Sequence, residues 1–212
     1  MTTLLYIEAS PRKNRSCSSE IGDAFVDAYL NHHPEHKIKT INVWRHDLPE
    51  MAGEMVKAVY SSIQQLELNH HEEKEWKKIK ELTDEFKNAD KYLICAPMWN
   101  FSIPYRLKHY LDVIVQPGLT YKFSKENGYK GLVTGKPVTV ICSRGGEYVR
   151  QAQKLDMQQP YIDQVLRFIG FTDIRHVIVQ PTLDSSLFAT MDAVKAARDR
   201  ALAEAREIAG NF

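Results

Sequence analysis

Residues 4–19 read LLYIEASPRKNRSCSS and pass from an apolar run into a polar, serine-rich segment. The apolar run, Leu4–Ala9, has the length of a short buried strand. A helical pattern begins near Ser18, directly after the polar loop. A strand, a loop and a helix in immediate succession predict the first unit of an α/β fold.

The same succession recurs along the rest of the chain. We predict further strands over Lys37–Asn42, Tyr92–Ala96, Val138–Cys142 and Ile174–Val179. We predict helices over about residues 18–30, 54–68, 72–89, 104–115, 157–169 and 192–208. Strands that alternate with helices favour a parallel sheet covered on both faces. The polar, Gly-punctuated segment 118–135 is expected to be irregular, and long loops tend to be functional.

This pattern predicts a three-layer α/β sandwich of the flavodoxin-like kind. Its sheet has five parallel strands in the order 2-1-3-4-5, with helices on both faces. No repeat, low-complexity tract or linker interrupts the chain, so we expect residues 1–212 to form one domain.

Composition excludes several classes of protein. Hydrophobic residues make up 43% and charged residues 26% of the chain, as in soluble globular proteins. A net charge of +1 gives no broad attraction to nucleic acid or anionic lipid. We expect no signal peptide and no membrane span. The three cysteines are an odd number without CxxC spacing, which indicates free thiols and a reducing, cytoplasmic location.

Three loops follow strand ends where an open parallel sheet binds its ligands. The first loop leads into a helix N-terminus, which suits a phosphate group. Its hydroxyl and basic side chains are those of Ser10, Arg12, Lys13, Arg15, Ser16 and Ser18. No GxGxxG or GK[ST] motif is present, which disfavours dinucleotide and nucleoside triphosphate sites. The alternative is that the serines cap the helix and the basic residues are solvated.

The second loop is unusually apolar for a strand end. It consists of Pro97, Met98, Trp99, Asn100 and Phe101, and continues to Pro104. A flat ligand such as an isoalloxazine ring would account for this wall, and the amide of Asn100 would reach the ring edge. The alternative is a hydrophobic staple onto the next helix.

The third loop contains Ser143, Arg144, Gly145 and Gly146, followed by Tyr148. Paired glycines let a backbone turn tightly and approach a planar ligand. Alone, the motif would be an ordinary turn. The predicted fold brings all the loops to one rim, which favours a shared ligand.

With these motifs, the chain resembles the FMN-dependent NADH-azoreductase family and, more distantly, NAD(P)H quinone reductases. Ser10, Ser16 and Ser18 match its serine pattern, residues 97–101 its Pro-Met-Tyr/Trp-Asn-Phe motif, and residues 143–146 its Ser-Arg-Gly-Gly motif. The similarity extends from about residue 3 to residue 180. It implies non-covalent FMN, with the phosphate in the first loop, including Cys17, and the ring beside the other two.

The resemblance also implies a reaction. NADH or NADPH reduces the flavin and leaves before a quinone or azo compound takes up two electrons, in ping-pong order. No catalytic side chain is required; Arg144 and Tyr148 either polarise the acceptor or are surface residues. The resemblance further implies a homodimer that completes each active site. The charged segment Glu67–Lys80 departs from many members and leaves substrate preference open.

Other functions receive less support from the sequence. A flavodoxin-type electron carrier is usually acidic, unlike this chain. The histidines at 32, 33, 36, 70 and 71 are interpreted as solvated, because adjacent helical residues point different ways, so no metal site is expected. Cys17 near a helix N-terminus could have a lowered pKa, but no histidine is placed to activate it. No GxSxG elbow and no nucleic-acid-binding motif is present.

Overall fold

The computed structural model describes residues 1–12, 15–64, 66–185 and 189–212, so Lys13 lies outside the described residues. The main sheet has five strands in the order β2-β1-β3-β6-β7, and every neighbouring pair is parallel. In chain order these strands are β1 (Thr3–Glu8), β2 (Lys37–Asn42), β3 (Lys91–Pro97), β6 (Val138–Ser143) and β7 (Ile174–Val179). The predicted 2-1-3-4-5 order is confirmed.

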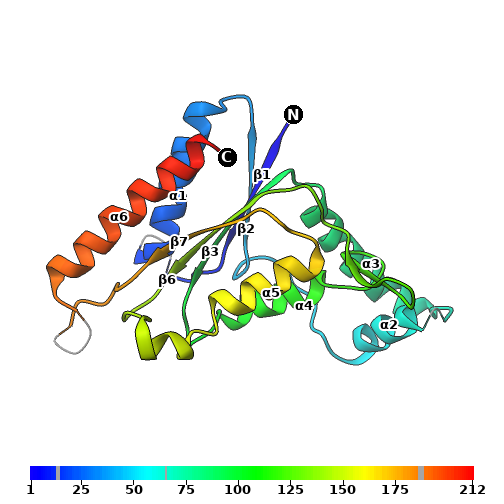
Figure 1. The fold of residues 1–212 in the computed structure, drawn as a ribbon. Coiled ribbons are helices and arrows are strands. Elements are labelled where there is room, and N and C mark those ends of the chain that lie inside the picture. Colours follow the sequence, from blue (N-terminus) through cyan, green and yellow to red (C-terminus); the bar gives the residue numbers. More distant parts are fainter. Residues whose placement is uncertain (13–14, 65, 186–188) are drawn as a thin grey trace.

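Helices cover both faces of this sheet (Figure 1). One face carries α1 (Cys17–His32) and α6 (Met191–Gly210), and the other carries α3 (His70–Lys87), α4 (Tyr105–Ile114) and α5 (Gln159–Ile169). Helix α2 (Gly53–Ile63) packs beside α3. None of the helices in the described part of the chain is long and apolar enough to cross a membrane.

The alternation of side chains along β1 explains the layers. Leu4 and Tyr6 lie in the core beneath α1 and α6, whereas Leu5 and Ile7 lie in the core on the opposite face. Successive residues of a strand point to opposite faces, so an uninterrupted apolar run is buried on both. The predicted strand at residues 4–9 therefore occupies the middle of the sandwich.

Several helix boundaries differ from the prediction. Helix α2 ends at Ile63 rather than near residue 68, and α3 begins at His70. Asn69 caps α3: its side chain accepts from the backbone of Glu72, whose carboxylate accepts from the Asn69 N–H. This capping box fixes the start of the helix. The charged segment Glu67–Lys80 therefore forms, from His70 onward, the first part of a surface helix.

The expectation that residues 118–135 are irregular is wrong. They contain an antiparallel hairpin of β4 (Tyr121–Ser124) and β5 (Gly128–Gly131). A Cβ on Gly131 would lie 2.3 Å from the backbone nitrogen of Gly170, so the hairpin packs directly on the end of α5. Strands of four residues with exposed, polar positions lack the apolar run that marks a buried strand. A short 3-10 helix, η2 (Arg150–Leu155), was also not predicted.

Candidate functional site

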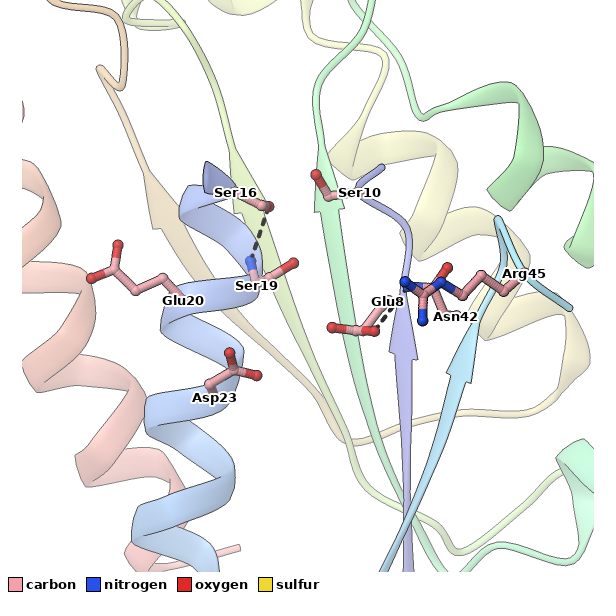
Figure 2. Close-up of a pocket in the computed structure, with 8 residues that line it drawn as sticks. All are labelled: Glu8, Ser10, Ser16, Ser19, Glu20, Asp23, Asn42 and Arg45. Atoms are coloured by element: carbon pink, nitrogen blue, oxygen red, sulfur yellow. Dashed lines mark hydrogen bonds between the residues drawn. The ribbon is translucent and has the colours of Figure 1, made fainter. Parts of the chain in front are cut away.

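The first loop forms a serine-lined rim between the start of α1 and the end of β1. Ser16 is the N-cap of α1, and its Oγ accepts from the Ser19 N–H at 3.2 Å. The hydroxyls of Ser16 and Ser18 lie 3.2 Å apart. Ser10 and Ser16 are buried residues that line one cavity of about 450 Å³ (Figure 2). The structure therefore brings the predicted serines together.

This rim suits a phosphate, but the floor of the same cavity does not. The first backbone N–H groups of a helix lack intrahelical acceptors and attract anions. Farther from the rim, the cavity is lined by Glu8 and Asp23 and also by Arg45, whereas the Glu20 carboxylate projects from the far side of α1 (Figure 2) and accepts from Arg198. Burial and the nearby charge of Glu8 raise the pKa of Asp23. A dianionic group would therefore remain at the rim.

Cys17 does not have the lowered pKa that its position at a helix N-terminus suggested. Burial, and then repulsion from Glu20, raise the pKa of its thiol to about 11. A raised pKa favours the protonated thiol at neutral pH, which argues against a thiolate nucleophile at this position. What Cys17 offers an anion is its backbone N–H in the first turn of α1.

The second loop folds into a tight turn. The backbone groups of Trp99 and Ser102 bond reciprocally, at 2.8 and 3.0 Å. Asn100 and Phe101 between them have φ values of 45° and 72°. Two central residues with positive φ are the signature of a type I′ turn. A bulky residue in this region is strained, and such strain concentrates at functional sites.

The turn displays its aromatic side chains to solvent. Trp99 is 36% exposed and Phe101 48% exposed. Trp99 and Asn100 line an open cavity of about 440 Å³ together with Tyr105. Exposed aromatic faces beside a cavity are what a flat ligand requires. The alternative of a staple buried against the next helix is not supported for these residues.

Trp44, which no motif had identified, extends this aromatic wall. It follows β2, and its ring centroid lies 5.5 Å from that of Trp99 and 5.2 Å from that of Tyr105. Its indole N–H donates to the carbonyl of Ala9 at 2.9 Å. Trp44 therefore ties the aromatic turn to the residue that precedes Ser10.

The third loop is held by a buried polar network. Arg144 is only 3% exposed, and its Nη2 lies 2.8 Å from a carboxylate oxygen of Asp156. Its Nε donates to Gln158 at 3.1 Å and its Nη1 to Gln180 at 3.4 Å. The interpretation of Arg144 as a surface residue is therefore wrong. Its guanidinium is occupied within the protein, which leaves its backbone for a ligand.

One glycine of the pair packs against a neighbouring segment, and the other lies where a ligand can approach the loop. Neither Gly145 nor Gly146 has a positive φ. A Cβ on Gly145 would lie 2.7 Å from a methyl carbon of Leu183, whose backbone N–H donates to the Gly145 carbonyl. Gly145 therefore packs closely against the segment after β7. Gly146 is half-buried and lies at the accessible end of the loop.

The second and third loops are physically joined. The N–H of Met98 donates to the carbonyl of Ser143 at 2.7 Å, which continues the pairing of Pro97 with Ser143. The rings of Phe101 and Tyr148 lie 6.4 Å apart, edge to face. Together with the serine rim, these loops offer a phosphate cradle and a flat aromatic wall along one edge of the sheet. The residues present therefore fit FMN.

Known proteins agree with this geometry. The profile of the flavodoxin-like fold family matches residues 2–207. An FMN-dependent NADH:quinone oxidoreductase from Nitratidesulfovibrio vulgaris is 46% identical over 214 residues, covering 100% of both chains. An azoreductase from Bacillus anthracis has 26% identity, a TM-score of 0.89 and full coverage of both chains. An FMN-dependent NADH-azoreductase from Bacillus anthracis in complex with FMN has 26% identity and a TM-score of 0.83, covering 99% of this chain and 100% of that one. The chain therefore belongs to the flavodoxin-like fold family, with FMN-dependent NADH:quinone oxidoreductases and azoreductases among its relatives.

Proposed function

We propose that this protein is an FMN-dependent oxidoreductase that transfers electrons from NADH to quinones and azo compounds. The observation that carries the proposal is that a buried serine rim and a strained, exposed aromatic turn both lie at the carboxyl ends of neighbouring strands. The relatives and neighbours named above support it: one is an FMN-dependent NADH:quinone oxidoreductase, and two are azoreductases, one of them in complex with FMN.

Each predicted residue has a distinct part in this proposal. Bound FMN supplies reversible two-electron chemistry between donor and acceptor. Ser10, Ser16 and Ser18, with the first amides of α1, hold the phosphate. Trp99 and Phe101 form the wall for the ring, and Asn100 donates its amide to the ring edge. Pro97, Met98 and residues 143–146 shape the opposite border through their backbone.

Donor and acceptor use the same position over the exposed aromatic turn, so we propose ping-pong kinetics. The reaction needs no nucleophilic side chain, because the protein's part is to bind the flavin, orient the substrates and exclude water. An aromatic wall with few directional groups tolerates many flat acceptors. Broad acceptor specificity follows from this.

A redox titration tests the proposal. Protein that has been saturated with FMN and dialysed should retain a flavin spectrum, lose it with NADH under anaerobic conditions, and regain it with a quinone. Double-reciprocal plots at several acceptor concentrations should give parallel lines. Protein that retains neither FMN nor FAD would contradict the function, whereas intersecting lines would reject only the ping-pong order.

We also propose that the protein is a homodimer whose second copy completes the active site. An apolar groove between α4 and α5 supports this, because it shares Tyr161 with the cavity beside Trp99. The groove is lined chiefly by Leu111, Val115, Tyr161, Val165 and Phe168. Val165→Glu should halve the particle mass in light scattering, whereas Arg167→Glu, at an exposed position of the same helix that does not line the groove, should not. An unchanged mass for Val165→Glu would contradict this interface.

Two further assignments belong to the proposal. Residues 1–212 act as one domain, because the first and last strands of the sequence share a single sheet. The location is cytoplasmic, because Cys17, Cys95 and Cys142 are all free thiols, as expected of a reducing compartment.

A further inference from the structure

The turn that follows α1 brings two histidines together. The N–H of His36 donates to the carbonyl of His33 at 3.0 Å, with Pro34 in the second position of the turn. Proline is favoured there because its φ is fixed. The two imidazole rings are stacked, with centroids 4.6 Å apart and planes 10° from parallel. The expectation that these histidines are solvated is wrong for this pair, because both side chains are half-buried and face each other.

Glu35 adds a carboxylate to the pair. One ligand atom from each of His33, Glu35 and His36 lies within 4.8 Å of the others. The Nε2 of His36 lies 3.1 Å from the Oε1 of Glu35. Two ligands of a tetrahedral zinc ion, each at about 2.0–2.1 Å, are separated by roughly 3.3 Å. The gap between these two atoms therefore has the size of one edge of such a coordination shell.

The remaining nitrogen of His36 is already oriented. Its Nδ1 lies 2.7 Å from the hydroxyl of Tyr29, a residue buried in the core. Metal-binding histidines almost always use their second nitrogen in this way, which fixes the tautomer and aims the other nitrogen at the ion. Tyr29 thus directs Nε2 of His36 toward Glu35.

The position of His33 at the end of α1 favours a cation. The C-terminus of a helix carries a partial negative charge. His33 is the C-cap of α1 and is half-buried, which leaves its ring room to rotate out of the stack.

We propose that His33, Glu35 and His36 bind one divalent transition-metal ion of the zinc type, with water completing the coordination. Two imidazoles and one carboxylate suit zinc better than magnesium or calcium, which prefer oxygen ligands. The site lies at the end of α1 opposite Ser16, and a 16-residue helix is about 24 Å long. The ion therefore clamps the junction of α1 and β2, and is separate from the flavin site.

Titration of untagged, chelator-treated protein with zinc chloride tests this proposal. Calorimetry should show one ion per chain, with a heat that depends on the buffer because binding releases protons. The melting temperature should rise with zinc concentration, since the ion binds the folded state. Absence of saturable binding would overturn the proposal.

Substitutions of the proposed ligands test whether the ion binds at this turn. His33→Ala and His36→Ala should each abolish the calorimetric signal, and Tyr29→Phe should weaken binding by about 10–100-fold. The matched control is the double variant His70→Ala with His71→Ala, which changes a histidine pair on α3. It should bind zinc as the unchanged protein does. His33 contributes little to the core, so its variant should retain the circular dichroism of the parent. Binding that survives in His33→Ala, or that is lost in the control, would refute the assignment.

Discussion

Replacing Ser16 by aspartate is expected to weaken FMN binding by about 100-fold or more, whereas asparagine at the same position should leave it within a fewfold. Ser16 is the N-cap of α1, and aspartate and asparagine cap helices as well as serine does. Only the aspartate adds a charge at the phosphate rim. A carboxylate roughly 5 Å from the phosphate costs on the order of 3 kcal/mol at an effective dielectric constant near 20.

Riboflavin separates this electrostatic effect from a loss of fold. It has the same ring as FMN but lacks the phosphate, so Ser16→Asp should bind it as the unchanged protein does. Quenching of flavin fluorescence on titration measures both affinities, and circular dichroism reports on the helix. Equal losses for FMN and riboflavin would point to damage of the turn, and an unchanged FMN affinity would place the phosphate elsewhere.

The strands and the site loops were predictable because their signals are local. A continuous apolar run such as Leu4–Ala9 indicates a strand buried on both faces. Alternation with helices then predicts a parallel sheet, and the sheet predicts where its ligand binds. The loops after β1, β3 and β6 could therefore be assigned to one rim before their contacts were known.

The features that were missed depend on contacts between distant residues. Gln158 donates to the carbonyl of Ala96, which is 62 positions away in the sequence. Trp44 reaches Ala9 across β2 and β1. Arg144 resembled a surface residue because no pattern near it identifies Asp156 as its partner. The His33–His36 pair was misjudged because a turn, unlike a helix, brings such side chains face to face.

Asp156→Asn is expected to lower the free energy of unfolding by about 3 kcal/mol, because it leaves the buried guanidinium of Arg144 without its ion partner. For a chain of this length, the melting temperature should fall by roughly 6–12 °C. Asparagine retains the oxygen that accepts from the N–H groups of Gln158 and Gln159, so the start of α5 is preserved. FMN affinity should fall as well, because Arg144 anchors the third loop.

The matched control is Asp173→Asn. Asp173 pairs with Arg175 at 3.0 Å on the surface, where both side chains are at least one-third exposed. Exposed pairs contribute about 0–1 kcal/mol, so this variant should melt close to the parent. Calorimetric thermal unfolding of both variants measures the difference between their melting temperatures. Equal effects at the two positions would contradict the assignment of Arg144 to a desolvated network.

A second substitution distinguishes charge from position. In Arg144→Met with Asp156→Asn, neither buried charge remains, so part of the lost stability should return relative to Asp156→Asn alone. Recovery will be incomplete because Gln158 and Gln180 lose the donors that Arg144 supplied. FMN affinity should stay low even so, because the methionine cannot tie the third loop to Asp156. If affinity instead recovers with stability, the network acts on the flavin site only through the fold, and Arg144 has no positioning role.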